Sequence, residues 1–429
     1  MKLELIKSKK VAIWGFGVEG KAVANYLLRN KISFSVLCKS HETEGDYNYL
    51  TQEITTDVLN RFDIIIKSPG ISPYSERVKL STAYFTSPTA LWFANEKKTQ
   101  VIAVTGTKGK STTVSLLAHI LKKQGKSVNL VGNIGQALIS SHSNYDYIVL
   151  EASSFQIYDG NIQADIAVIC NLFSEHIDWH QGKNNYFNDK LKLLDKATIK
   201  ILNAKNATLN SLCSNTEAIY FNTRNNYHIN GNSLYKHDTK LIQLSEIQLL
   251  GWHNLENCAA VLTVCDCLQL NTEQCINAIK SFKPLSHRLQ NLGIIAGFHA
   301  INDSIATTPV ATLAALATVD LSKTTLFVGG YDRGYDWCDF VDSLAKIPMR
   351  LMILSGQNAK KIHDLLKNKT TAFNYILCNN LTEAIKTALQ YSNTGDTLLL
   401  SPGAPSFDQF DSYIKRGEFF EEELKRYEN

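Results

Sequence analysis

The sequence predicts an α/β protein made of three consecutive domains. The chain has 429 residues, and at roughly 150 residues per domain this length corresponds to about three. Short apolar runs alternate with helical stretches along the chain, which is typical of parallel sheets covered by helices on both faces. Apolar residues make up 44% and charged residues 20%, a composition that excludes a disordered or collagen-like chain.

The charge and cysteine content predict an ordinary cytoplasmic protein. Lys and Arg number 44 against 40 Asp and Glu, a net charge of +4, and no basic block marks a nucleic-acid-binding arm. The apolar runs are strand-sized, so no membrane helix is expected. The first residues include Glu4 and do not form a secretory signal. Nine scattered cysteines favour a reduced protein in which most of them are buried.

The first domain is expected over residues 1–95. Strands are predicted at 11–14, 33–37 and 63–67, with a helix from Lys21 to about Arg29. Gly15, Gly17 and Gly20 have the spacing of a dinucleotide fingerprint, but the second strand has no carboxylate at its end. NAD is therefore not expected. A nucleotide diphosphate at the helix N-terminus and a tight turn without ligand both remain open.

The second domain is expected over residues 96–284, after a polar linker at 96–100. Strands are predicted at 101–104, 147–150 and 166–169, and a helix ends near Lys123. The Asn-rich stretch 203–250 is interpreted as a β-meander attached to this domain. A third α/β series over 285–429 has strands at 325–328, 351–354 and 397–400.

The sharpest local feature is a candidate phosphate loop at residues 105–112. It lies between a predicted strand and helix, where backbone N–H groups and the helix dipole favour a polyphosphate. Lys110 would reach the β- and γ-phosphates, and the Ser111 hydroxyl would face Mg²⁺. Val104 stands where the general pattern has its first glycine, so the loop is a shorter variant.

Acidic and histidine side chains follow two further strands. Glu151 comes directly after one strand, where a Mg²⁺ ligand belongs in a phosphate-loop fold. The spacing of His176, Asp178 and His180 lacks the further ligand that zinc would need, so a single histidine on a metal ion or phosphate is favoured and His180 could be exposed. By composition alone, Lys190 would be a surface lysine.

Several separated segments together resemble the ATP-dependent Mur ligases of peptidoglycan synthesis, in the branch that adds glutamate. These segments occur in the order of the family and span nearly the whole chain: residues 68–71, 105–112, 132–135, 151–156, 175–178, 189–191, 253–257, 287–288, 302–304 and 401–406. The resemblance implies a Rossmann-like N-terminal domain for a uridine nucleotide, a central P-loop ATPase domain and a Rossmann-like C-terminal domain that closes over the site.

The resemblance also implies a reaction and its participants. The carboxylate of UDP-N-acetylmuramoyl-L-alanine would attack the γ-phosphate of ATP to give an acyl phosphate, and the glutamate amino group would then displace phosphate. Such phosphoryl transfer depends mainly on positioned charge. ATP, two Mg²⁺ ions and a carbamylated Lys190 are the expected cofactors, and nucleic acid and membrane are not expected as partners. We expect a monomer.

The resemblance assigns site residues by position. The expected catalytic residues are Lys110, Glu151, His176 and Lys190, and the metal ligands are Ser111, Glu151, His176 and the Lys190 carbamate. ATP would contact Gly106, Thr107, Lys108, Gly109, Lys110, Ser111, Thr112, Asn257, Arg288 and Asp303. The UDP-muramoyl substrate would contact Val18, Glu19, Ser68, Gly70, Asn133 and Ser153.

Departures from the family pattern favour L-glutamate over D-glutamate. Cys38 stands where the D-glutamate enzymes have an Asp for uracil, Ile305 replaces a lysine, and Arg333 stands about where they have a glutamate-binding lysine. An arginine grips a carboxylate differently from a lysine. Thr307, Arg333, Ser406 and Tyr413 would line the glutamate pocket, and a separate epimerase would act on the product. The alternatives are D-glutamate addition, a folylpolyglutamate-type ligase and an ATP-binding regulator that does not ligate.

Overall fold

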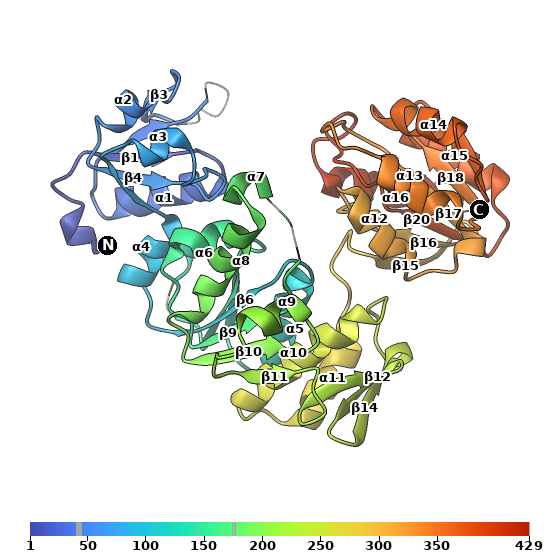
Figure 1. The fold of residues 1–429 in the computed structure, drawn as a ribbon, viewed down its shortest axis with the longest axis horizontal. Helices are drawn as coiled ribbons and strands as arrows, with labels where there is room; N and C mark the ends of the chain where they lie inside the picture. Colours follow the sequence, from blue (N-terminus) through green and yellow to red (C-terminus); the bar gives the residue numbers. More distant parts are fainter. Residues whose placement is uncertain (40–44, 143, 174, 176, 429) are drawn as a thin grey trace. The chain divides into compact units, whose positions relative to one another are not determined.

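The structure is a computed structural model that describes residues 1–39, 45–142, 144–173, 175 and 177–428. The chain forms two compact units, one of residues 1–243 and 255–282 and the other of residues 244–254 and 283–429. Parallel sheets flanked by helices in both units confirm the α/β class (Figure 1). The second unit resumes at Lys283, close to the start predicted for the third domain. The division predicted at residue 95 falls inside the first unit, and the three domain boundaries stay a prediction.

The N-terminal sheet has the order β3-β2-β1-β4-β5, and all its strands are parallel. Its strands are β1 (Val11–Trp14), β2 (Ser35–Leu37), β3 (Asn48–Leu50), β4 (Ile64–Lys67) and β5 (Tyr84–Thr86), and its helices are α1 (Val18–Arg29), α2 (Thr56–Leu59), α3 (Glu76–Lys79) and α4 (Pro88–Asn95). Helix α1 begins three residues earlier than predicted because Gly17 is its N-cap. A Cβ on Gly20 would lie 2.1 Å from the Gly15 carbonyl oxygen, so this glycine allows α1 to approach β1 closely.

The central sheet has the order β11-β10-β9-β6-β8-β7 and is also parallel throughout. Its strands are β6 (Gln100–Thr105), β7 (Val128–Gly132), β8 (Tyr147–Glu151), β9 (Ile166–Ile169), β10 (Ile199–Asn203) and β11 (Ile219–Phe221). Its helices are α5 (Lys110–Lys123), α6 (Ser154–Gly160), α7 (Ile177–His180), α8 (Lys183–Leu191), α9 (Ala207–Leu212), α10 (His253–Cys267) and α11 (Thr272–Ser281). The chain leaves β6 toward β7 and later crosses to β9, so the carboxyl ends of β6, β8 and β9 meet where α/β folds bind ligands.

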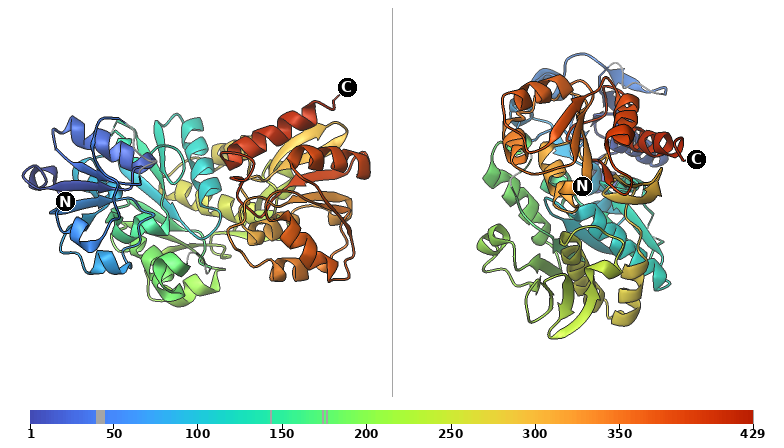
Figure 2. Two further views of the ribbon diagram at one scale, coloured as in Figure 1. Left: turned by 90° about the horizontal axis from the view of Figure 1, so that it is seen from above. Right: turned by 90° about the vertical axis from the view of Figure 1, so that its right-hand side faces the viewer.

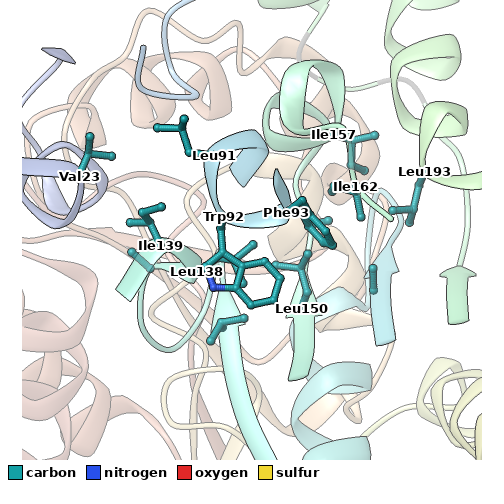
Figure 3. Close-up of a cluster of buried hydrophobic side chains, with 14 of the residues drawn as sticks. Val23, Leu91, Trp92, Phe93, Leu138, Ile139, Leu150, Ile157, Ile162 and Leu193 are labelled. Atoms are coloured by element: carbon teal, nitrogen blue, oxygen red, sulfur yellow. The ribbon is translucent and has the colours of Figure 1, made fainter. Parts of the chain in front are cut away.

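One hydrophobic core joins the N-terminal and central sheets. Val23 of α1 and Leu91 of α4 belong to the same buried cluster as Leu150 of β8 and Ile157 of α6 (Figure 3). The predicted polar linker is short and fastened to this core. Glu96 accepts a hydrogen bond from the Tyr26 hydroxyl at 2.9 Å, and β6 already begins at Gln100. The two sheets therefore share apolar burial, which is the main stabilising contribution to folding.

The predicted meander is present as an antiparallel sheet of β12 (Tyr227–Asn230), β13 (Ser233–Lys236) and β14 (Thr239–Gln243). Asp266 of α10 holds it in place, because its two carboxylate oxygens accept from the Tyr227 hydroxyl at 3.0 Å and the Lys236 ammonium at 2.7 Å. This confirms that the meander is attached to the central sheet and its helices.

The second unit contains one six-stranded sheet in the order β15-β16-β20-β17-β18-β19, in which only β15 is antiparallel. Its strands are β15 (Gln290–Ile295), β16 (Phe298–Asn302), β17 (Thr324–Val328), β18 (Leu351–Leu354), β19 (Asn374–Leu377) and β20 (Thr397–Leu400), and its helices are α12 (Pro309–Leu316), α13 (Cys338–Ala345), α14 (Ala359–Lys367), α15 (Leu381–Tyr391) and α16 (Tyr413–Lys425).

Successive strand residues of this sheet point into two different cores. Leu326 packs with α12, α13 and α14, whereas Phe327 packs with α15 and α16. Figure 2 shows these helices on opposite faces of the sheet, with α16 in red. Because side chains alternate along a strand, a continuous apolar run such as 326–328 is what a sheet covered on both faces requires.

Two composition-based expectations concern cysteines and membrane helices. Seven of the nine cysteines are buried, which confirms the prediction for most of them. Within the described chain, none of the helices has the length and apolar character needed to span a bilayer.

Candidate active site

The loop between β6 and α5 has the conformation expected of a phosphate loop. Gly109 has φ of +82° and is the N-cap of α5, which begins at Lys110. A Cβ at Gly109 would lie 2.6 Å from the Asn257 side-chain oxygen, so glycine is required both by the backbone angle and by this contact. Asn257 also accepts a hydrogen bond from Thr113 at 3.2 Å, which brings one predicted ATP contact of α10 to the loop.

The residues after β9 fix the shape of this loop. The Thr107 backbone N–H donates to the Asn171 carbonyl at 3.0 Å, and the Lys108 N–H donates to the Asn171 side-chain oxygen at 2.9 Å. The Lys108 ammonium lies 2.7 Å from a Glu175 carboxylate oxygen. Gly106, Ser111 and Thr112 complete the loop, and Ser111 is buried at the start of α5.

Two lysines, the partly buried Lys110 and the buried Lys190, converge on the loop from different helices. Lys110 donates to the carbonyl oxygens of Gly106 at 2.9 Å and Thr107 at 3.0 Å. Lys190 of α8 donates to the same Gly106 oxygen at 3.0 Å. Burial lowers the pKa of Lys110, partly offset by nearby carboxylates, and burial together with Lys110 lowers the pKa of Lys190 well below its usual value. The composition-based expectation of a surface lysine is wrong for Lys190, which is 2% exposed.

Glu151 lies at the end of β8, beside the loop. One carboxylate oxygen accepts from the Asn133 amide at 3.1 Å, and the other is buried with no hydrogen-bond partner among the described residues. A carboxylate oxygen left unsatisfied in this way fits a cation ligand, because an unpaired buried charge is costly. No cluster of three His, Cys, Asp or Glu side chains able to hold a metal ion is found in the described ranges. A Mg²⁺ ion here would therefore take other ligands, as Mg²⁺ commonly does with phosphates and water.

His176 lies outside the described residues, so its predicted role stays a prediction. His180, which sequence reasoning allowed to be exposed, is completely buried between Ser154 and Asp189. Sequence reasoning missed this contact because only the fold brings α6, α7 and α8 together.

Predicted UDP-muramoyl residues from the two sheets are linked by hydrogen bonds. Ser153 caps α6 in a capping box with Gln156, and the Gln156 amide donates to Glu19 at 2.7 Å. Burial raises the pKa of Glu19. Gln156 was not singled out from the sequence, although a glutamine three residues after a serine is the signal of a capping box.

The remaining predicted nucleotide contacts lie at the start of α1 and after β4. Val18 is exposed, 79%, at the first position of α1. The Ser68 hydroxyl donates to the Gly15 carbonyl at 3.1 Å, and the Gly70 carbonyl accepts from the Trp179 indole at 3.1 Å. Cys38 is buried after β2.

Asp303 and Arg288 belong to the second unit. The Asp303 carboxylate accepts from the Leu289 backbone N–H at 3.1 Å and the Ser401 hydroxyl at 2.8 Å. Burial raises the pKa of Asp303 to about 7, although these hydrogen bonds and Arg288 oppose the shift. Arg288, the neighbour of Leu289, is partly buried.

The predicted glutamate residues lie on four segments of the second unit. The buried guanidinium of Arg416, unremarked in the sequence, donates to the carbonyls of Ser304 at 2.8 Å and Ala404 at 2.9 Å. The Ser304 hydroxyl donates to the carbonyl of Tyr413, the first residue of α16. Arg416 thereby holds together the segments that carry Thr307, Ser406 and Tyr413.

Two predicted glutamate contacts differ in exposure. The Ser406 hydroxyl is buried, with no hydrogen-bond partner within the part of the chain that the structure describes. Arg333 is exposed on the segment before α13. A buried hydroxyl and an accessible guanidinium are both suited to bind a carboxylate, but their common role stays a prediction.

The fold and the loop together define an α/β enzyme with a phosphate loop. Residues 104–265 match the Mur ligase middle domain, and residues 287–403 match the Mur ligase glutamate ligase domain. The chain is 37% identical to the UDP-N-acetylmuramoyl-L-alanine–L-glutamate ligase of Xanthomonas euvesicatoria, over 98% of this chain and 96% of that protein. It is 34% identical to the UDP-N-acetylmuramoylalanine–D-glutamate ligase of Oenococcus oeni, over 98% of both chains. The chain belongs to the Mur ligase family and is an ATP-dependent ligase.

Solved structures agree with the three-domain Mur ligase fold. The chain resembles the UDP-N-acetylmuramate-alanine ligase of Thermotoga maritima with a TM-score of 0.63 at 18% identity, over 98% of this chain and 100% of that one. A MurF ligase from Thermotoga maritima, solved in complex with ADP, gives a TM-score of 0.60 at 16% identity, over 97% of this chain and 95% of that one.

Proposed function

We propose that this enzyme uses ATP to join glutamate to UDP-N-acetylmuramoyl-L-alanine during synthesis of the peptidoglycan precursor. The names of relatives that align over nearly the whole chain support this substrate pair. The single structural observation that carries the proposal is the sharing of the Gly106 carbonyl by Lys110 and Lys190. Lys110 thereby brings a positive charge to the phosphate loop, which is what transfer of a phosphoryl group requires, and Lys190 lies beside it as the site of the proposed carbamate.

In the first step, a carboxylate oxygen of the nucleotide substrate attacks the γ-phosphorus of ATP. The bond from that phosphorus to the β–γ bridging oxygen breaks, and ADP and an acyl phosphate result. In the second step, the glutamate amine attacks the acyl carbon, a tetrahedral intermediate forms, and phosphate leaves with the bonding electrons. The amine loses a proton, and an amide remains.

Lys110 lies where its ammonium can neutralise the charge that develops on the phosphate oxygens. The carboxylates of Glu151 and Glu175 act on its pKa in the direction that keeps it protonated. Gly106, Thr107, Lys108, Gly109, Ser111 and Thr112 would bind ATP from the loop, and Asn257, Arg288 and Asp303 would contact the rest of the nucleotide. Mg²⁺, when bound, would withdraw charge from the phosphates, with the Ser111 hydroxyl and the free Glu151 oxygen as ligands.

Lys190 would carry the carbamate. Burial of Lys190 and, after it, repulsion from the Lys110 ammonium on the same carbonyl lower the pKa of Lys190 and favour its neutral amine. A neutral amine can attack the carbon of CO₂, form an N–C bond and release a proton. The anionic product beside Lys110 replaces the repulsion with attraction. With His176, the carbamate would hold a second Mg²⁺ ion.

The remaining residues would select the two substrates. Glu19, Ser153 and Asn133 would contact the UDP-muramoyl substrate together with Val18, Ser68 and Gly70. Thr307, Arg333, Ser406 and Tyr413 would bind glutamate. The exposed Arg333 supports a changed carboxylate contact, so we favour L-glutamate, with a separate epimerase acting on the product. We also propose that the enzyme acts as a monomer in the cytoplasm.

The test is phosphate release from ATP and Mg²⁺ with UDP-N-acetylmuramoyl-L-alanine and each glutamate isomer separately. We expect release that needs both substrates and is faster with L-glutamate. Release without the muramoyl substrate would favour a regulator that only hydrolyses ATP, and release with a folate in its place would favour a folylpolyglutamate-type ligase. Equal or faster turnover with D-glutamate would contradict the isomer assignment alone.

A further inference from the structure

Asp189 is a buried carboxylate that receives three hydrogen bonds from three different segments. One oxygen accepts from His180 Nδ1 at 2.7 Å and from the Tyr74 hydroxyl at 2.9 Å. The other oxygen accepts from Lys192 at 2.9 Å. Asp189 is 1% exposed, so these donors and not water satisfy its charge.

The contact continues beyond His180. The other ring nitrogen, Nε2, lies 2.9 Å from the Ser154 hydroxyl. Ser154, His180 and Asp189 thus have the order of a nucleophile, a base and an orienting acid. All three are at most 2% exposed, and the Trp179 and Tyr186 rings pack against the imidazole with centroids 4.5 and 5.2 Å away. A substrate cannot reach the Ser154 hydroxyl. The three residues therefore have a structural role, because their hydrogen bonds connect α6, α7 and α8.

The positions it holds adjoin the candidate active site. Asp189 is the residue before Lys190, and Ser154 is the residue after Ser153. Tyr186, one turn earlier on α8, lies 3.0 Å from the Thr107 hydroxyl of the phosphate loop. Helix α8 is therefore fixed on one side by Asp189 and on another by the loop, and its rotation sets where the Lys190 amine lies.

Tyr74, which also donates to Asp189, connects the segment after β4 of the N-terminal sheet to this carboxylate. Tyr74 follows Ser68 and Gly70 on the segment after β4. The Ser72 hydroxyl donates to the Trp179 carbonyl at 2.6 Å, and the Gln181 amide donates to the Tyr74 carbonyl at 3.1 Å. The segment that would bind the uridine nucleotide is thus tied to the helices that precede Lys190.

We propose that Asp189 is a positioning residue that, with His180, sets the location of the Lys190 amine and links it through Tyr74 to the segment at residues 68–74. This inference rests on the proposed function of Lys190. Groups that orient a metal ligand typically matter by roughly 10- to 100-fold in activity.

The first test is Asp189→Asn in the full chain, with Asp195→Asn as the matched control, because Asp195 is an exposed carboxylate shortly after α8. We expect kcat for ADP release to fall roughly 10- to 100-fold, with KM for ATP within about threefold of the parent, while the control keeps its kcat. Loss of ATP binding with kcat retained, or an equal loss in the control, would overturn the proposal.

A second variant keeps the proposal testable if Asp189→Asn does not fold. Tyr74→Phe removes one hydroxyl and leaves the ring in place. We expect KM for the nucleotide substrate to rise by roughly threefold to tenfold, with KM for ATP unchanged. In the double variant Asp189→Asn/Tyr74→Phe, provided that it folds, Tyr74→Phe should cause no additional rise in KM for the nucleotide substrate. Both substitutions disturb the same Tyr74–Asp189 hydrogen bond. No change in KM in Tyr74→Phe, or fully additive effects in the double variant, would overturn the link.

A third measurement separates this proposal from that for Lys190. If a short carboxylate such as acetate rescues Lys190→Ala, the rescued rate should be insensitive to Asp189→Asn, because a diffusible carboxylate has no side chain to position. A rescued rate that still falls tenfold would overturn the positioning role. Absence of any rescue would contradict the carbamate. The role of Asp189 would then be decided by kcat and KM for ATP in Asp189→Asn and Asp195→Asn.

Discussion

The amines of Lys110 and Lys190 donate to one acceptor, the carbonyl oxygen of Gly106, at 2.9 and 3.0 Å. The first lysine opens α5 and the second lies near the end of α8, 80 positions later in the sequence. Two amines at one carbonyl, one of them buried, cannot both carry a full charge without cost. This contact explains why a lysine that composition would place on the surface becomes a candidate for modification.

Replacing Lys190 with alanine should abolish most of the activity. We expect kcat to fall by about a hundredfold or more, since the variant lacks the amine that would carry the proposed carbamate. A short carboxylic acid such as acetate should restore part of the rate. The measurement is ADP release at saturating substrates with and without acetate. Lys196→Ala, which changes an exposed lysine shortly after α8, should behave like the parent. A fully active Lys190→Ala would refute the assignment.

Gly109→Ala should damage ATP binding more than a matched glycine change. Gly109 and Gly125 both have positive φ, +82° and +75°, but only a Cβ at Gly109 would meet a neighbour, the Asn257 oxygen at 2.6 Å. Both variants should lose about 1 kcal/mol of stability from the backbone, and only Gly109→Ala should raise KM for ATP, by roughly tenfold or more. Thermal unfolding and steady-state kinetics measure the two effects. Equal kinetic effects would show that the contact is unimportant.

Arg333→Lys should weaken glutamate binding. A lysine has one compact ammonium in place of the planar guanidinium and cannot make a bidentate contact with a carboxylate. We expect KM for L-glutamate to rise roughly tenfold, equivalent to about 1.4 kcal/mol, with KM for ATP unchanged. Arg224→Lys, at an exposed position beside β12, is the control. An unaltered KM for glutamate would show that Arg333 does not bind the glutamate carboxylate.

Asp303 should make the stability of the ligand-free protein depend on pH. Its pKa is raised to about 7 by burial, so between about pH 4 and 7 the folded protein holds a proton that the unfolded chain releases. The contribution of this group to stability therefore falls as the pH rises through that window, by on the order of 4 kcal/mol. Thermal unfolding of the parent and Asp303→Asn at pH 5 and pH 8 measures it. Compared with pH 5, the variant should be more stable relative to the parent at pH 8. A stability difference that is the same at both pH values would contradict the raised pKa.

Local patterns predicted much of the fold and part of the site. The apolar runs at 101–104 and 351–354 mark buried strands, because a strand covered on both faces is expected to be apolar along its length. The phosphate loop was predictable because its glycines and lysine act within one turn between a strand and a helix. The sequence pattern predicts a helix from Lys21, whereas α1 begins at Val18 because Gly17 is its N-cap.

The sequence by itself determined the α/β class, the phosphate loop and the family, because these depend on neighbouring residues or on motifs in a fixed order. Only the tertiary structure decided that His180 is buried against Asp189, that Gln156 reaches Glu19, and that Arg416 joins three segments of the second unit. The physical reason is that burial and hydrogen-bond partners depend on segments far apart in the chain. A lone histidine or lysine has no local pattern that states which helix will cover it.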